Sequence, residues 1–192
     1  MRKKIVKKST EKPISHNLGN LLLVLSILMF FTIFYPVIST YLFPPEIKNV
    51  AELKGDFITI PKIKAQAPLI FNVDPWTESV YKKILKKGVA HAKGTALPGE
   101  EGRSFIFAHS SGNPLEQINY NTVFLKLGDL EIGDEILINR NGQIYRYTVT
   151  QKKIVYPNEI SYLKVDGEGL IVQTCWPIGT SFKRLLVFAA PE

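Results

Sequence analysis

One cysteine, one histidine and one arginine are the residues of this sequence whose types and placement suit nucleophilic chemistry. Cys175 is the only cysteine, so it can form neither a disulfide within the chain nor a cysteine-based zinc site. It lies where a strand-like apolar run ends in a Pro/Gly turn, which predicts rigidity on one side and access on the other. A thiol is nucleophilic as the thiolate, which requires partial exposure and a positive neighbourhood. The alternative is a buried, unreactive small side chain.

A positive neighbour for the thiol is available nine residues later, at Arg184, which opens the next apolar run. This separation is about what a turn needs to bring the chain back beside Cys175. If the two strands pair antiparallel, Arg184 lies near the sulfur and can stabilise a thiolate or a tetrahedral oxyanion. The alternative is that Lys183 and Arg184 are solvated charges at a strand end.

Three histidines are candidates for proton transfer. His16 borders a long apolar segment and is set aside. His91 lies in a Gly-Val-Ala-His-Ala run, whereas His109 follows the apolar run Phe105–Ala108 and precedes small residues. A histidine just beyond a buried strand is placed to face a cleft, and its pairing with the only cysteine favours His109 as the proton carrier. A purely structural histidine is the competing interpretation.

The elements that must position these residues are short β-type runs broken by turn residues. Asn141-Gly142 between two such runs predicts a hairpin with a two-residue turn. Helical spacing occurs over 77–87, with Val80, Ile84 and Leu85 on one face, and a second short helical piece is expected around 121–127. The pattern predicts a mostly β fold, a closed and mostly antiparallel barrel. The expected strands are 57–60, 69–71, 103–108, 135–138, 143–150, 152–156, 169–174 and 184–189.

A membrane anchor is expected before the barrel. Residues 13–45 contain no Asp, Glu, Lys or Arg, and six basic residues precede them. Leu21–Phe43 is long enough as a helix to cross a hydrocarbon core of ~30 Å. The basic flank predicts a cytoplasmic N-terminus and an extracytoplasmic domain. A cleaved signal peptide or a buried core helix is less well matched, because the apolar run is long and has no polar face.

The predicted division is therefore a basic tail over 1–17, a transmembrane anchor over 18–44, a linker over 45–55 and a catalytic domain over 56–192. Pro36 is expected to kink or end the helix near the outer interface, with Tyr35 and Tyr41 at headgroup level.

Composition argues against several other functions. Beyond Pro45 there are 18 basic and 16 acidic residues, so the high pI belongs to the tail and no nucleic-acid partner is expected. No phosphate-binding glycine loop, paired metal-binding histidines or nucleophile elbow occurs. No cofactor or metal is predicted. An acidic cluster is read as a solvated edge, with a weak calcium site as the lesser alternative; its members are Asp129, Glu131, Asp134 and Glu135.

Several of these segments, in order, resemble the sortase family of cysteine transpeptidases. The resemblance covers nearly the whole chain after the anchor, and its blocks are Ile58–Lys64, Ala67–Ile70, Gly88–His91, Gly94–Gly99, Phe105–His109, Gly133–Ile136, Thr174–Thr180 and Arg184–Leu185, with Phe124, Leu127 and Leu130 between them. Ala108 replaces the glycine that usually precedes the catalytic histidine, and Ile171-Val172 replaces a Thr-Leu pair. These departures leave the subclass open, with a class D- or E-like or divergent member as the range.

The resemblance implies a sortase-type barrel and a defined chemistry. Cys175 would attack a sorting signal of the Leu-Pro-x-Thr-Gly kind and form a thioester, which an amine from a cell-wall precursor or a pilin would then resolve. His109 would act as general acid and base, Arg184 would stabilise the oxyanion or the substrate, and Thr174 and Ala108 would line the substrate pocket. The implied partners are secreted proteins with a C-terminal sorting signal, the amine acceptor and membrane lipid, at the bacterial plasma membrane.

Two other functions remain open. A sortase-fold hydrolase would pass the thioester to water, and a tethered barrel with an inert Cys175 would act as a binding module. A wall transpeptidase with a Ser-His-Gly-Cys type motif is disfavoured, because no histidine closely precedes Cys175.

Overall fold

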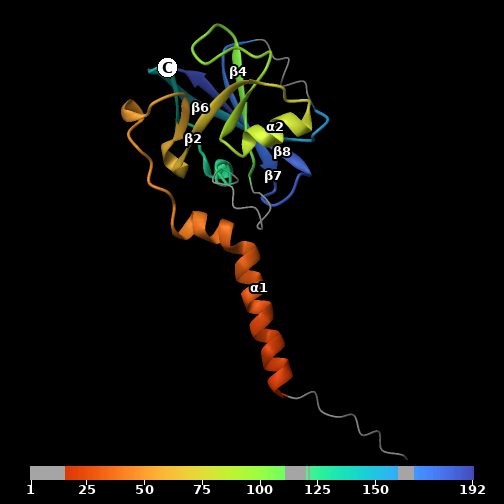
Figure 1. Cartoon of the computed structure of the whole chain (residues 1–192). Helices are drawn as coiled ribbons and strands as arrows, with labels where there is room; N and C mark the ends of the chain where they lie inside the picture. Colours follow the sequence, from red (N-terminus) through yellow and green to blue (C-terminus); the bar gives the residue numbers. More distant parts are fainter. Residues whose placement is uncertain (1–15, 111–119, 121, 160–166) are drawn as a thin grey trace, which may run out of the picture.

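Eight strands close into one barrel above a long helix (Figure 1). The computed structural model describes residues 16–110, 120, 122–159 and 167–192. The barrel order is β1-β2-β3-β4-β7-β8-β6-β5, which confirms the predicted closed, mostly β fold. The strands are β1 (Phe57–Ile60), β2 (Ala65–Val73), β3 (Val89–Ala92), β4 (Arg103–Phe107), β5 (Glu135–Arg140), β6 (Gln143–Val155), β7 (Gly169–Trp176) and β8 (Lys183–Pro191).

The barrel is mostly antiparallel, but two of its seams are parallel: β2 with β3, and β4 with β7. Parallel neighbours need a long crossover, and the chain between β4 and β7 supplies one that includes the β5–β6 hairpin. That hairpin turns at Asn141-Gly142, where both residues have positive φ, as its sequence predicted.

Three local expectations were wrong. β3 was not predicted as a strand, because Val89–Ala92 is short and all four of its residues are buried, which removes the alternation that marks a strand. The runs 143–150 and 152–156 form one strand, β6, which continues through a register shift between Val149 and Gln151. Around 121–127 the described residues form turns that lead into a single 3₁₀ turn, η3 (Leu127–Asp129).

The barrel interior is filled by aliphatic and aromatic side chains from every strand. The segment that leads into and out of η3 contributes Phe124, Leu127 and Leu130, each fully buried, so this irregular stretch is part of the core. A buried large apolar side chain stabilises the fold by roughly 1.5–3 kcal/mol. The position of η3 against the barrel is therefore held by packing.

Helix α2 (Glu78–Leu85) lies against the barrel wall next to β2 and β3. Leu85 is buried and Ile84 is half-buried, as the spacing predicted. Val80 was expected on the same face but is 44 % exposed, and Tyr81 packs inward in its place. The helix therefore turns its aromatic residue toward the barrel.

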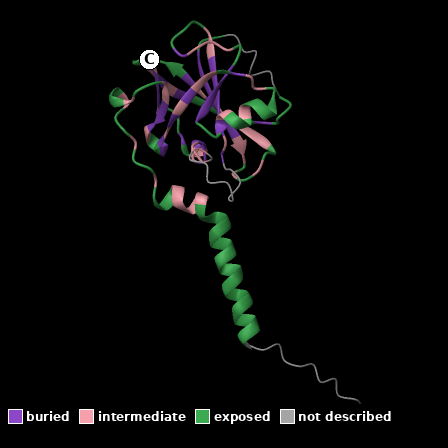
Figure 2. Ribbon diagram, in the orientation of Figure 1, coloured by how far each residue is buried: buried purple, intermediate pink, exposed green. Residues whose placement is uncertain are grey.

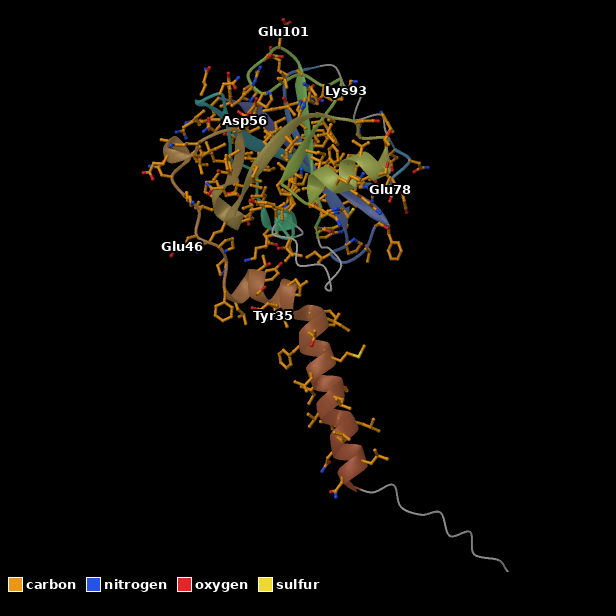
Figure 3. All side chains as sticks on the ribbon, viewed as in Figure 1. Tyr35, Glu46, Asp56, Glu78, Lys93 and Glu101 are labelled. Carbon is orange, nitrogen blue, oxygen red and sulfur yellow. The ribbon has the colours of Figure 1, made fainter. Side chains whose placement is uncertain are left out.

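Helix α1 (His16–Leu42) is the one helix among the described residues that is long and apolar enough to cross a membrane. Pro36 lies inside it, and Figure 3 shows the helix bending at the labelled Tyr35. Proline removes a backbone donor and clashes with the preceding turn, which accounts for the bend.

The chain between α1 and β1 is bound to the barrel. Gln66 on β2 makes two hydrogen bonds to the backbone of Lys48, Lys48 N to Oε1 at 3.0 Å and Nε2 to Lys48 O at 2.9 Å. Further along, Asn139 Nδ2 on β5 donates to Leu53 O at 3.2 Å. The segment predicted as a linker is thus fixed at two points.

Gly169, at the start of β7, is expected to tolerate no side chain. Its φ is +117°, and a Cβ there would lie 2.5 Å from Ala189 O on the neighbouring strand. Gly133 also has positive φ (+96°), but a Cβ there meets open space. We expect Gly133→Ala to lower the free energy of unfolding by only ~1–2 kcal/mol, because of backbone strain. Gly169→Ala should lower it by roughly 1–3 kcal/mol more, because the clash adds to that strain. Equal losses in urea unfolding would contradict this.

Candidate active site

The parallel seam between β4 and β7 brings His109 and Cys175 to the same end of the barrel. Phe107 is the register partner of Gln173 on this seam. His109 lies two residues beyond Phe107, and Cys175 lies two residues beyond Gln173. The pairing continues past β4, because Ala108 N donates to Gln173 O at 3.2 Å. The histidine and the cysteine therefore follow their strands to equivalent positions.

The antiparallel seam between β7 and β8 adds Arg184. Cys175 and Arg184 are direct register partners, which is the pairing that the spacing of nine residues suggested. Opposed residues in an antiparallel pair have Cβ atoms about 4.5–5.5 Å apart. The sheet itself thus places the base of the Arg184 side chain beside that of Cys175. Three residues far apart in sequence converge at one mouth of the barrel.

Exposure at this mouth suits a reactive group. Cys175, His109 and Arg184 are all half-buried, so the thiol is not sealed in the core. Thr174 and Ala108, one residue earlier on each strand, are buried, and Thr174 Oγ1 donates to Ala108 O at 3.1 Å. This hydrogen bond ties together the two strand ends that carry the cysteine and the histidine.

The Arg184 side chain is held over the turn that precedes it. Its Nη1 donates to Ser181 O at 2.9 Å and to Lys183 O at 3.1 Å. Two backbone carbonyls thus fix one edge of the planar guanidinium and restrict its rotation. A preorganised cation of this kind stabilises developing negative charge without having to reorient.

Tyr81 is a neighbour of the site that the sequence did not reveal. Its ring packs edge-on against Phe107 of β4, with centroids 6.0 Å apart. Burial raises the pKa of the Tyr81 phenol, Glu78 raises it further, Lys82 and Arg184 lower it, and Cys175 raises it. The Tyr81 hydroxyl therefore lies near both Arg184 and Cys175. The sequence gave no signal that Tyr81 would lie near the site, because it is one position from Val80, the residue expected on the buried face of this short helix.

Trp176 follows the cysteine and packs against η3. A Cβ at Gly128 would lie 2.8 Å from the Trp176 ring, so the indole packs directly on the backbone of η3. Lys152 on β6 donates to Gly128 O at 3.0 Å and holds this turn in place. The residue next to Cys175 is therefore supported by a part of the chain that precedes it by nearly fifty residues.

His91 has a structural environment that differs from that of His109. It is fully buried, and its ring packs on Phe71 with centroids 5.4 Å apart. Asn72 N donates to Nδ1 at 3.5 Å, which assigns the proton to Nε2, and Nε2 lies 2.9 Å from Ala96 O and 3.0 Å from Thr95 Oγ1. Burial lowers the pKa of His91, so the ring is held neutral.

The acidic cluster is distributed over separate local interactions. Asp134 Oδ2 accepts a hydrogen bond from Glu131 N at 2.7 Å, and Glu135 pairs with Arg146 on the next strand. Asp129 and Glu131 are exposed. Among the described residues no group of three or more His, Cys, Asp or Glu side chains is arranged to hold a metal ion.

Comparison with known proteins was decisive for the family. The family model of the sortase domain matches residues 58–192. The chain belongs to the sortase family. The barrel, and the order of His109, Cys175 and Arg184 along the chain, thus agree with the resemblance seen in the sequence. The subclass stays open.

This sortase is similar to several characterised relatives. It is 28 % identical to "Sortase D" of Bacillus subtilis (strain 168) over 152 residues, covering 73 % of this chain and 68 % of that protein. The structure of sortase C1 of GBS Pilus Island 1 matches with a TM-score of 0.60 and 28 % identity, covering 71 % of this chain and 63 % of that one. Clostridium perfringens sortase C, solved with the C-terminal cell wall sorting motif, matches with a TM-score of 0.58 and 30 % identity, covering 71 % and 69 %.

The buried, neutral state of His91 predicts a pH dependence of stability. The imidazole of the unfolded chain has a pKa of about 6.5, whereas burial lowers the pKa in the folded state. Below about pH 6.5 the unfolded chain binds the proton first, so the free energy of unfolding should fall by up to ~1.4 kcal/mol per pH unit until the folded pKa is reached. Urea unfolding between pH 7.5 and 5 measures this slope.

The variant His91→Gln removes the titrating group and should flatten that part of the profile, although it lowers stability overall. A variant with the same slope as the parent would show that another group is responsible.

Proposed function

We propose that this sortase is a membrane-anchored cysteine transpeptidase that cleaves a sorting signal through a Cys175 thioester and transfers it to an amine. The observation that carries the proposal is the pairing of Cys175 with Arg184 at the barrel mouth reached by His109. Sortase membership supports the acyl-transfer chemistry. The Clostridium perfringens sortase C solved with the C-terminal cell wall sorting motif supports a sorting signal as the substrate, and the Leu-Pro-x-Thr-Gly kind is the one that the sequence resemblance implies.

In the acylation step Cys175, as the thiolate paired with imidazolium His109, attacks the carbonyl carbon of the scissile peptide bond. A carbon–sulfur bond forms, and the carbonyl electrons move onto oxygen, where the Arg184 guanidinium stabilises the negative charge. When the carbon–nitrogen bond breaks, His109 as imidazolium donates its proton to the leaving amine. The products are the thioester on Cys175, a free amine and a neutral His109.

In the second step an amine attacks the thioester carbonyl. His109, now neutral, takes the proton of the attacking amine, and the thiolate leaves as the new peptide bond forms. Electrons and protons return to their starting places, so the cycle needs no external oxidant or reductant. The acceptor in this proposal is an amino group of a cell-wall precursor or of a pilin.

Thr174 and Ala108 are proposed to line the substrate pocket through their backbone. Their side chains are buried, and their mutual hydrogen bond fixes the strand ends beside the reacting groups. A bound peptide would therefore meet main-chain groups at these positions, which suits a substrate recognised as an extended segment.

The proposed location is the bacterial plasma membrane, with α1 spanning it, the N-terminus in the cytoplasm and the barrel outside. The apolar α1 and the basic residues before it support this topology. The donors would be secreted proteins that carry a C-terminal sorting signal, and tethering raises the effective concentration of such a donor at the membrane.

The decisive experiment incubates the full chain in detergent micelles with a library of Leu-Pro-x-Thr-Gly-type peptides, with and without an amine acceptor, and measures products by mass. We expect a covalent adduct on Cys175 and a ligated product when the amine is present, and neither with Cys175→Ala. Hydrolysis alone would assign a hydrolase. A folded protein whose Cys175 resists a small alkylating agent at neutral pH would assign a binding module.

Arg184 and Lys183 offer a matched pair of neighbouring cations. Only Arg184 is in register with the cysteine, whereas Lys183 Nζ lies over the Tyr156 ring at 5.2 Å. We expect Arg184→Ala to lower kcat by roughly 10²–10³-fold, as loss of an oxyanion donor does, and Lys183→Ala to leave it nearly unchanged. Comparable losses in both variants would refute the oxyanion role and leave only a general effect of positive charge.

A further inference from the structure

The outer end of α1 packs against the barrel domain. Along α1 the residues from 17 to 35 are exposed, but Pro36–Thr40 are all half-buried. Figure 2 shows this change in the last turns of α1, which lie directly below the barrel. The first turn and a half beyond the bend is therefore partly buried, whereas Tyr41 and Leu42 at the end of the helix are exposed.

Two contacts define this docking. Thr40 Oγ1 lies within hydrogen-bonding distance, 3.3 Å, of Thr122 Oγ1. Lys126 Nζ lies over the Tyr41 ring, 4.4 Å from its centroid, which is the geometry of a cation–π interaction. Both partners on the domain side belong to the stretch that leads into η3.

The same stretch reaches the cysteine end of the barrel. Gly128 lies two residues beyond Lys126, and it carries the Trp176 ring on its backbone. Trp176 directly follows Cys175. Thus only one short, well-packed turn separates the end of the membrane helix from the mouth of the barrel.

The connection that follows α1 also restricts movement. The chain between α1 and β1 is bound to Gln66 on β2 and to Asn139 on β5, as described above. Figure 3 shows the labelled Glu46 where this connection leaves the docked helix end. An unattached linker of this length would let the domain rotate freely, whereas these hydrogen bonds leave only residues 43–47 between α1 and the first point fixed to the barrel.

The length of α1 before the bend places the docked turns at the membrane surface. An α-helix from Asn17 to Tyr35 rises about 28 Å at ~1.5 Å per residue, close to the ~30 Å of a hydrocarbon core. The turns after Pro36 then lie at headgroup level, between the lipid and the barrel. Exposed aromatic side chains on both sides of the bend, Tyr35 and Phe43, suit that interface.

From these contacts we propose that the outer turns of α1 and the Thr122–Asp129 segment form a fixed joint that holds the Cys175 end of the barrel against the outer surface of the bilayer. The anchor is then a positioning element for the barrel mouth as well as a tether. The inference concerns orientation, so it stands independently of the transpeptidase chemistry.

The test measures the height of two barrel positions above the membrane. In a Cys175→Ala background, a single fluorophore is attached either at Phe182→Cys or at Glu101→Cys. Phe182 is 73 % exposed in the turn after β7, and Glu101 lies on the side of the barrel away from α1 in Figure 3. The full chain is reconstituted in phosphatidylcholine vesicles that contain a headgroup-level quencher. We expect strong quenching at position 182 and little at position 101.

A charge reversal tests the joint. Lys126→Glu places a carboxylate over the Tyr41 ring, whereas Lys93→Glu changes the net charge equally at an exposed site that Figure 3 shows away from α1. Losing the cation–π contact should shift the docked-to-undocked ratio by roughly two- to fivefold. Lys126→Glu should therefore reduce the contrast between positions 182 and 101, and Lys93→Glu should preserve it.

Two outcomes would overturn the proposal. Equal quenching at positions 182 and 101 in the parent chain would mean that the barrel has no preferred orientation. A contrast that survives Lys126→Glu as fully as Lys93→Glu would mean that the orientation does not come from this joint. Neither outcome depends on whether Cys175 is catalytically active, because the labelled proteins lack that thiol.

Discussion

The parallel pairing of β4 with β7 is the constraint on which the site depends. Parallel neighbours end at the same edge of a sheet, so the residues that follow β4 and the last residues of β7 must emerge together. Because β8 pairs antiparallel with β7 after a short turn, it begins at the edge where β7 ends. A histidine, a cysteine and an arginine thus share one mouth, without any of them having to hold the others in place.

The mouth of the barrel is also supported by an irregular segment, η3. η3 carries no regular hydrogen-bonding ladder, yet Leu127 is fully buried, Trp176 packs on Gly128, and Lys152 binds the Gly128 carbonyl. Packing of this kind leaves few alternative positions for the residue beside the cysteine. The same stretch also contacts the end of α1. It therefore supports the residue beside the cysteine and, at the same time, holds the barrel against α1.

The histidines show how burial divides one residue type between two uses. His91 lies inside the barrel, where its ring nitrogens are occupied by backbone and hydroxyl partners and desolvation favours the neutral form. His109 lies half-buried just beyond a strand that itself is almost wholly buried. Access to the mouth thus separates the buried imidazole of His91 from that of His109, the histidine proposed to transfer protons.

Sequence alone predicted the barrel class and the long apolar helix and named the candidate trio, because alternation, turn residues and a single cysteine are local properties. The short spacing between Cys175 and Arg184 even predicted their pairing, since a tight return between neighbouring strands leaves few registers. Tertiary structure decided what depends on distant partners: the buried strand β3, the inward turn of Tyr81 in place of Val80, the seat of Trp176 on Gly128 and the docking of α1. Each of these is a contact between segments far apart in the chain, and no local pattern encodes which distant surface a side chain will meet.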